Sequence, residues 1–122
     1  MVLFFDPGPS TGIAVVDGDS VLFTTVVRNA SDDELEDIAA SLAEKYAQAS
    51  VGIEAPPMLS GNMRPVTQRI EEILRKHFQN ARWVRPSDWK NTPSARTKVP
   101  SNLTQHEKDA VRAGRWMERV GG

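Results

Sequence analysis

Residues 2–12 are Val2-Leu3-Phe4-Phe5-Asp6-Pro7-Gly8-Pro9-Ser10-Thr11-Gly12. Four consecutive apolar residues are typical of a strand that is buried on both faces of a sheet. This strand ends in the carboxylate of Asp6, and a charge at the end of a central strand is unfavourable unless something neutralises it. The segment therefore predicts a buried first strand with a functional acid at its end.

Apolar and β-branched runs predict four more strands, over residues 12–16, 21–27, 51–55 and 81–85. Asp17-Gly18 lies between the first two of these runs and favours a tight hairpin, because such a turn needs positive φ. The strand over 51–55 carries another acid, Glu54, and Pro56-Pro57 ends it because proline cannot continue a hydrogen-bonded ladder.

Helical spacing of apolar residues predicts three helices, over residues 31–46, 65–78 and 104–120. Ser31 with Glu34, and Thr104 with Glu107, have the spacing of a capping box that opens a helix. The residues between the last strand and the last helix, 86–103, are rich in Pro, Ser, Asn and basic residues. They predict a long mobile basic loop with at most a short helix.

The predicted order is βββαβαβα within one domain of 122 residues. Strands separated by helices imply parallel crossovers, so we expect an α/β fold with a mixed five-stranded sheet flanked by helices. This order resembles the ribonuclease H-like fold, in which the first and fourth strands are parallel neighbours. Actin-like kinases share that core but need a second large domain, for which 122 residues leave no room.

Asp6 and Glu54 both lie at the carboxyl ends of predicted strands. If the two strands are parallel neighbours, both carboxylates lie at the sheet edge where open α/β sheets bind ligands. Two adjacent carboxylates repel each other, so either one takes up a proton or a divalent cation lies between them. Oxygen ligands suit Mg²⁺ or Mn²⁺. The alternative is that Asp6 caps a turn and Glu54 pairs with a surface base.

His106 and Asp109 are three residues apart in the last helix and therefore share one face. That face continues through small and apolar residues, at positions 110, 113 and 117, that suit close packing on a sheet. Alone, His106 would be a core histidine and Asp109 a partner of the helix dipole. Together with Asp6 and Glu54 they favour a metal site. Glu107 is assigned to the capping box, with a ligand role as the alternative.

Three segments resemble the RuvC family of Holliday junction resolvases, and the short chain is more similar to its phage-encoded members. They are Asp6-Pro-Gly-Pro-Ser-Thr-Gly-Ile-Ala14, Val51-Gly-Ile-Glu54 and His106-Glu-Lys-Asp109-Ala110. The resemblance implies a homodimer that acts on four-way DNA junctions. It also implies Asp6, Glu54 and Asp109 as catalytic carboxylates that bind two Mg²⁺ or Mn²⁺ ions. His106 occupies a further catalytic and metal-binding position, where members have either an acid or a histidine.

The sequence departs from the family after Glu54, where Pro56-Pro57-Met58 replaces the aromatic residue expected to wedge into a junction. Met58 and Met63 are candidates either for apolar wedges or for buried contacts at the start of a helix.

Charge is distributed unevenly along the chain. Residues 1–63 hold ten acidic and two basic residues, a net charge of −8, whereas residues 64–122 hold thirteen basic and six acidic residues, a net charge of +7. The basic half predicts an anionic partner, and an uneven surface without a partner is the alternative.

The candidate nucleic-acid-binding residues lie in this basic half. They are Arg64, Arg69, Arg85, Trp89, Lys90, Arg96, Lys98, Lys108 and Arg112. Basic side chains bind phosphates, and an exposed Trp89 in the loop would stack on unpaired bases, whereas Trp83 is assigned to the core. For the basic stripe on the last helix, a solvated helix face is the alternative.

The chain has no cysteine, no signal peptide and no apolar run of membrane-spanning length, which predicts a cytoplasmic protein without a membrane partner, in the host cytoplasm if it is phage-encoded. We therefore expect a metal-dependent, structure-selective endonuclease that resolves branched DNA by paired cuts. The alternatives are a ribonuclease H-like nuclease acting on RNA–DNA hybrids and a non-catalytic DNA-binding protein.

Overall fold

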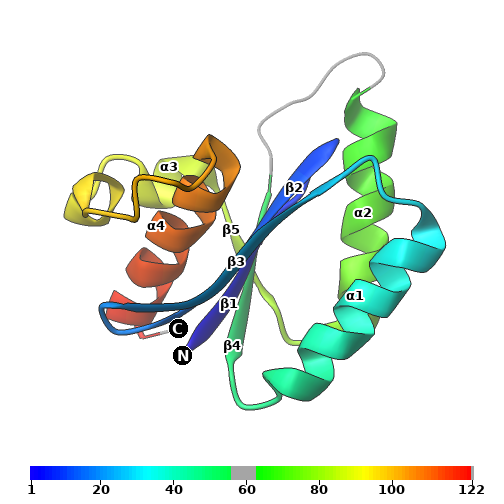
Figure 1. Cartoon of the computed structure of the whole chain (residues 1–122), viewed down its shortest axis with the longest axis horizontal. Coiled ribbons are helices and arrows are strands. Elements are labelled where there is room, and N and C mark those ends of the chain that lie inside the picture. The colour runs from blue at the N-terminus through cyan, green and yellow to red at the C-terminus, as the bar shows by residue number, and fades with distance from the viewer. Residues whose placement is uncertain (56–62, 122) are drawn as a thin grey trace.

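A computed structural model describes residues 1–55 and 63–121 of the chain. Its centre is a five-stranded sheet in the order β3-β2-β1-β4-β5 (Figure 1). The strands are β1 (Val2–Asp6), β2 (Ser10–Asp17), β3 (Ser20–Arg28), β4 (Ser50–Glu54) and β5 (Arg82–Val84). β1 pairs antiparallel with β2 and parallel with β4, and β4 pairs parallel with β5. The mixed sheet expected from the sequence is confirmed.

Helices cover both faces of the sheet. Helices α1 (Asp32–Lys45) and α2 (Met63–His77) lie on one face, and α4 (Gln105–Arg119) lies on the other, with α3 (Pro86–Trp89) beside it (Figure 1). Helix α2 begins two residues before the proline at position 65. That proline still lies in the first turn of the helix, where its missing N–H removes no intrahelical bond.

Both predicted capping boxes are present. The Ser31 hydroxyl accepts a hydrogen bond from the Glu34 N–H at 3.2 Å, and the Thr104 hydroxyl accepts one from the Glu107 N–H at 3.2 Å. In each box the glutamate side chain bonds back to the N–H of the capping residue. These bonds satisfy amide groups that a helix start otherwise leaves unpaired, and they fix where α1 and α4 begin.

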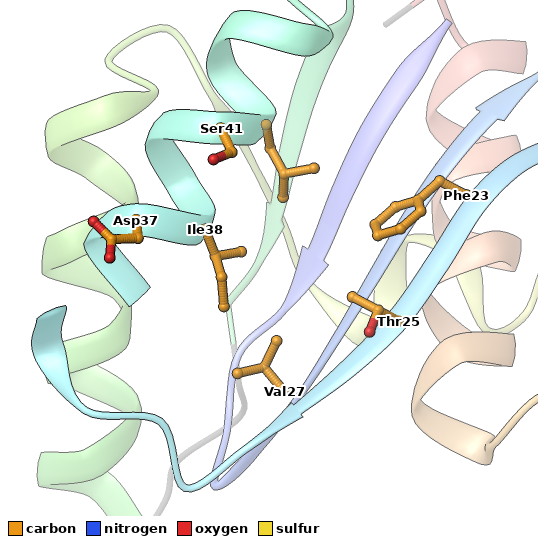
Figure 2. A pocket seen from close by; sticks show the side chains of 7 residues that line it. Phe23, Thr25, Val27, Asp37, Ile38 and Ser41 are labelled. Carbon is orange, nitrogen blue, oxygen red and sulfur yellow. The ribbon is translucent and has the colours of Figure 1, made fainter. Parts of the chain in front are cut away.

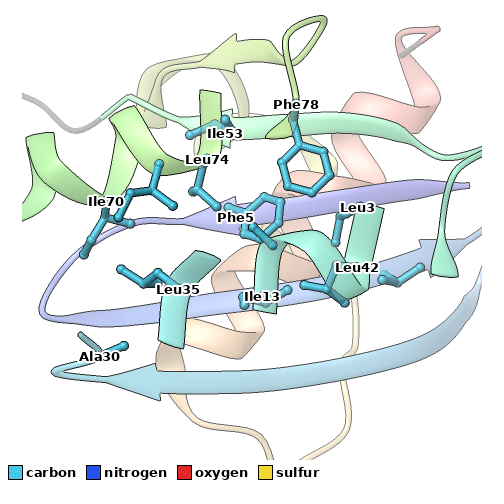
Figure 3. Close-up of a cluster of buried hydrophobic side chains, with 13 residues drawn as sticks. Leu3, Phe5, Ile13, Ala30, Leu35, Leu42, Ile53, Ile70, Leu74 and Phe78 are labelled. Atoms are coloured by element: carbon cyan, nitrogen blue, oxygen red, sulfur yellow. The ribbon is translucent and has the colours of Figure 1, made fainter. Parts of the chain in front are cut away.

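Side chains of the central strand alternate between two cores because successive residues of a strand point to opposite faces. Leu3 and Phe5 lie in the core beneath α1 and α2, where the Phe5 ring lies 5.2 Å from that of Phe78 (Figure 3). Val2 and Phe4 lie in the second core, beneath α4. By the same alternation, Asp6 belongs to the face that α4 covers.

The segment from residue 86 to residue 103 packs against α4, whereas the sequence suggests a long loop with at most a short helix; the mobility of the segment stays a prediction. It contains α3 and a 3-10 helix, η1 (Pro93–Arg96), and it buries Trp89 and Ser94. Helix α4 holds it through two arginines: Arg112 Nε donates to the Thr97 carbonyl at 3.3 Å, and Arg115 donates to the Lys98 carbonyl at 2.7 Å. The residue composition of the segment gives no indication of these contacts, because they are made by backbone carbonyl groups.

Among the helices of residues 1–55 and 63–121, none is both long enough and apolar enough to cross a membrane.

Helix α4 approaches the sheet very closely because the strands present glycines to it. A Cβ at Gly12 would lie 2.5 Å from the His106 carbonyl oxygen and 2.8 Å from its carbonyl carbon. A Cβ at Gly52 would lie 2.6 Å from Met117 Sδ and 2.7 Å from Cδ2 of Phe4. The first turn of α4 therefore packs directly on the backbone of β2 at Gly12. Because Gly12 pairs with Asp6 on β1, this contact brings the start of α4 next to Asp6.

Gly12→Ala should destabilise the protein by about 1–3 kcal/mol, the usual effect of overpacking. Replacing a strand glycine by alanine is otherwise stabilising, so the sign of the change is diagnostic. Gly52→Ala is the comparison variant and should lose less, since the obstacles there are side-chain atoms that can move. Urea denaturation measures both changes, and a Gly12→Ala protein as stable as the wild type would contradict the close contact.

Candidate active site

The candidate site lies at the carboxyl-terminal edge of the two central parallel strands. Asp6 is the last residue of β1 and Glu54 the last of β4, and Phe5 pairs with Ile53 immediately before them. Phe5 and Ile53 both belong to the core under α1 and α2. The residues that follow them therefore point to the opposite face, and both carboxyl groups lie on the α4 side of the sheet.

Glu54 is almost fully buried, with 8% of its surface exposed. One carboxylate oxygen, Oε1, accepts a hydrogen bond from the indole Nε1 of Trp89 at 3.0 Å. The carboxyl group of Asp6 lies next to it, close enough for the two groups to influence each other's ionisation. A buried carboxylate is strongly unfavourable without such partners, so these contacts hold Glu54 in place.

The environment of Asp6 favours its neutral form. Burial, the side-chain contact with Glu54, and the negative charges of Glu54 and Asp109 together raise the pKa of Asp6 to about 9, and the ammonium group of Lys90 acts in the opposite direction. The charge of Asp109 reaches Asp6 because α4 lies against this edge. We refer to Asp6, Glu54 and Asp109 as the acidic cluster.

His106 and Asp109 reach this edge from the first two turns of α4. His106 Nδ1 lies 3.9 Å from Asp6 Oδ2, although half of the histidine side chain is exposed. Asp109 Oδ1 accepts a hydrogen bond from Gln105 Nε2 at 2.9 Å. The buried stripe expected to follow them is confirmed, since Ala110, Ala113 and Met117 are inaccessible to solvent. The structure thus places all four residues that the sequence singled out at the same edge of the sheet.

The donor set fits a divalent cation. Three carboxylates and an imidazole are suitable ligands for Mg²⁺ or Mn²⁺, and a cation would replace the proton that the crowded charges place on Asp6. In the described part of the chain, however, no three His, Asp or Glu side chains converge tightly enough to bind one ion as they stand. Asp109 is turned towards Gln105, so metal binding requires this side chain to rotate.

Glu107 serves α4 rather than the acidic cluster. Its Oε1 accepts hydrogen bonds from the N–H and the hydroxyl of Thr104, at 3.1 and 3.0 Å. These contacts and the charge of Arg28, outweighing burial, lower the pKa of Glu107. The capping assignment is confirmed.

The loop between β1 and β2 is held by its own threonine. Thr11 is buried, and its hydroxyl donates to the Gly8 carbonyl at 3.0 Å and accepts from the Gly8 N–H at 3.4 Å. Both contacts stabilise the backbone of the loop that follows Asp6.

The basic candidates fall into two groups. Arg85, Lys90, Arg96 and Lys98 have exposed side chains on the segment next to α4, and Lys108 is half-buried on α4 itself. Three of the candidate arginines already have protein partners: Arg69 binds Asp32 and donates to the Ala30 carbonyl, Arg112 donates to the Thr97 carbonyl, and the exposed Arg85 pairs with Asp88 at 3.6 Å. Met58 lies outside the described residues, as do the side chains of Met63 and Arg64.

The prediction of Trp89 as an exposed base-stacking residue is wrong. The side chain is 2% exposed and packs in the core under α4, and its indole N–H bonds to Glu54. Its role as the partner of Glu54 was missed. A signal existed in the sequence: Pro86 can start a helix and Asp88 can cap it, as the 2.9 Å bond from the Arg85 N–H shows. Trp89 is then the large apolar residue of a helical turn.

An apolar groove of about 380 Å³ lies elsewhere, between β3 and α1, and is lined by Phe23, Thr25, Val27, Asp37, Ile38, Ser41 and Leu42 (Figure 2). None of these residues belongs to the acidic cluster. The groove supplies one carboxylate and no base, so it does not compete with the sheet edge as a candidate active site.

The contribution of Asp6 to stability should fall as pH rises from about 4 to about 9, and above pH 5 this should lower the stability of the protein. The folded protein holds a proton on Asp6 up to about pH 9, whereas the unfolded chain releases it near the ordinary value of 3.8, so unfolding releases a proton between these limits. Asp6→Asn should remove this dependence and raise stability at pH 8. Urea denaturation at pH 5, 7 and 9 measures both effects. Asp19→Asn, in the exposed β2–β3 turn, is the control, and an Asp6→Asn protein with an unchanged pH profile would contradict the raised pKa.

No family profile and no curated protein matches the sequence. Solved structures do match the fold. The RuvC structure from T. thermophilus in complex with a Holliday junction substrate superimposes with a TM-score of 0.75 at 12% sequence identity, covering 96% of this chain and 92% of that one. A second Thermus thermophilus RuvC structure gives a TM-score of 0.73 at 14% identity, covering 98% and 96%.

The two RuvC structures match nearly the full length of both chains, and the match includes the sheet and the helices on both of its faces. The α/β, ribonuclease H-like architecture expected from the order of elements is confirmed. The chain has the fold of the RuvC Holliday junction resolvases.

Proposed function

We propose that this protein is a metal-dependent, structure-selective endonuclease that hydrolyses phosphodiester bonds in branched DNA and resolves four-way junctions by paired cuts. The observation that carries this proposal is the acidic cluster, in which carboxylates from β1, β4 and α4 meet at one edge of the sheet. The fold supports it, because a RuvC structure with the same architecture contains a Holliday junction substrate.

In this proposal Asp6, Glu54, Asp109 and His106 hold two Mg²⁺ or Mn²⁺ ions. Bound ions of this kind lower the pKa of a water molecule and stabilise the attacking and leaving oxygens of a phosphate. The half-exposed imidazole of His106 can carry a proton between the site and solvent, since one ring nitrogen lies near Asp6 while half of the side chain is open to solvent.

The exposed bases beside the site are proposed to bind DNA. Arg85 and Lys90 flank α3, and Arg96 and Lys98 follow it on the same segment. Because the segment is packed against α4, the backbone that carries these charges is already ordered, and binding has to order only the side chains. Four further bases are proposed to contribute less to DNA binding: Arg64, Arg69, Lys108 and Arg112. Arg69 and Arg112 contribute less because they already bond to protein groups.

A homodimer with twofold symmetry is proposed because a four-way junction has twofold symmetry and paired cuts need two sites. Helix α2 is the proposed contact, from the resemblance to RuvC. Light scattering at micromolar concentration measures the mass, and a monomer that still cuts junctions in pairs would contradict the dimer. The proposed location is the cytoplasm, that of the host if the protein is phage-encoded.

A substrate panel separates this function from its alternatives. Labelled four-way junction, fork, duplex and RNA–DNA hybrid are incubated with Mg²⁺, Mn²⁺ or EDTA. Metal-dependent cutting of the junction supports the proposal, whereas cutting of the hybrid alone identifies a ribonuclease H-like activity. Binding without any cutting, combined with no uptake of metal, identifies a non-catalytic DNA-binding protein.

Asp6→Asn, Glu54→Gln and Asp109→Asn should each nearly abolish junction cutting, because each removes a charged ligand while leaving the shape of the site intact. His106→Ala should be milder and lose activity mainly at low metal concentration. Cleavage assays in Mg²⁺ and binding assays in Ca²⁺ measure the two properties separately, and binding should persist in all four variants. Near-normal cutting by any one of the three acid variants would show that the metal site is wrongly assigned.

Neutralising Arg96 and Lys98 together should weaken binding to every DNA substrate and should reduce the salt dependence of binding. Each lost phosphate contact lowers the slope of log affinity against log salt by about 0.9 for duplex DNA. Gel-shift titrations over a range of salt concentrations measure this slope. The control is Lys45→Gln, at the end of α1 on the opposite face of the sheet. Unchanged affinity at moderate salt would remove this segment from the interface.

A further inference from the structure

The indole of Trp89 is the partner that the structure gives to the buried acid Glu54. Nε1 of Trp89 donates to Oε1 of Glu54 at 3.0 Å, and both side chains are excluded from solvent. The indole N–H can only donate, and it carries no charge. It therefore satisfies one oxygen of the carboxylate without neutralising it, and the group remains available to Asp6 or to a cation.

The backbone that carries Trp89 is itself fixed. The one-turn helix α3 is capped by the bond from the Arg85 N–H to Asp88, at 2.9 Å. After the helix, the Trp89 carbonyl accepts hydrogen bonds from the N–H of Thr92 at 3.0 Å and from its hydroxyl at 2.6 Å. The ring packs in the core that α4 closes. The position of the indole N–H is thus determined by rigid structure rather than by a free rotamer.

We propose that Trp89 is a positioning residue for the metal-binding carboxylate of Glu54. The inference rests on the proposed function, since it concerns the same acidic cluster. The indole bond selects the Glu54 rotamer that keeps the carboxyl group against Asp6, so that the two acids are preorganised to bind a cation. Partners of this kind, which orient a ligand without touching the metal, typically change metal affinity by about 10–100-fold.

The other two tryptophans provide matched controls. The ring of Trp83 lies under the guanidinium of Arg75 at 4.3 Å, and that of Trp116 lies under that of Arg82 at 5.1 Å. Neither indole donates a hydrogen bond to a carboxylate among the described residues. Trp116 packs against the same core as Trp89, so Trp116→Phe tests the loss of an indole from this layer without a change at Glu54.

The first experiment is titration calorimetry with Mn²⁺ on the full chain without DNA. Trp89→Phe keeps an aromatic ring in the core and removes the N–H, and it should bind Mn²⁺ about tenfold more weakly, whereas Trp116→Phe should bind like the wild type. Adding Trp89→Phe to Glu54→Gln should cause little further loss, because the indole acts through that carboxylate. Circular dichroism and melting curves verify folding.

A second measurement leaves Trp89 in place. In the Trp83→Phe/Trp116→Phe protein, Trp89 is the only tryptophan and can be excited without exciting tyrosine, and binding of Mg²⁺ beside Glu54 should shift its emission. The shift should disappear in the same protein with Glu54→Gln. This readout reports on the contact between the indole and the carboxylate even if Trp89→Phe fails to fold.

The outcomes separate the two proposals. Wild-type protein that takes up no Mn²⁺ and cuts no junction overturns the proposed function and this inference together. Equal Mn²⁺ affinity of the wild type and a folded Trp89→Phe overturns the inference alone. The inference is also overturned if Trp89→Phe lowers Mn²⁺ affinity equally in the wild-type and the Glu54→Gln backgrounds. It is overturned as well if Trp89 emission does not change in a protein that binds Mg²⁺.

Discussion

Two carboxylates, Asp6 and Glu54, are confined at the ends of neighbouring parallel strands on the same face of the sheet. Their charges cannot both be accommodated there without a proton, a cation or strong hydrogen bonds. The surrounding structure supplies each kind of relief: Asp6 keeps its proton, the Trp89 indole bonds to Glu54, and Lys90 offers a positive charge. In the proposed function, a divalent metal ion takes the place of the proton on Asp6.

The close approach of α4 completes this arrangement. Gly12 lets the first turn of the helix rest on β2, which brings His106 and Asp109 to the strand ends. The arginines of α4 point the other way and hold the backbone of the 86–103 segment, as Arg115 does at the Lys98 carbonyl. One helix therefore serves both the acidic cluster and the basic surface beside it.

The fold could be predicted from sequence because its signals are local. The apolar run before Asp6, the Asp17-Gly18 turn, and the two capping boxes at Ser31 and Thr104 each fix an element within a few residues. Strand alternation and the parallel crossovers then leave few ways to arrange the sheet. The four residues of the candidate site could be predicted for the same reason, since each lies at the end of a strand or in the first turns of a helix.

The sequence by itself therefore determined the order of elements, the mixed sheet and the edge at which the acids meet. Only the tertiary structure decided what surrounds them. Trp89 lies thirty-five residues from Glu54 along the chain, and no local pattern announces a bond over that separation. Arg112 likewise has the appearance of a solvated helix residue until its contact with Thr97 is known. Partners of this kind depend on three-dimensional packing, because distant segments compete for the same donors and acceptors.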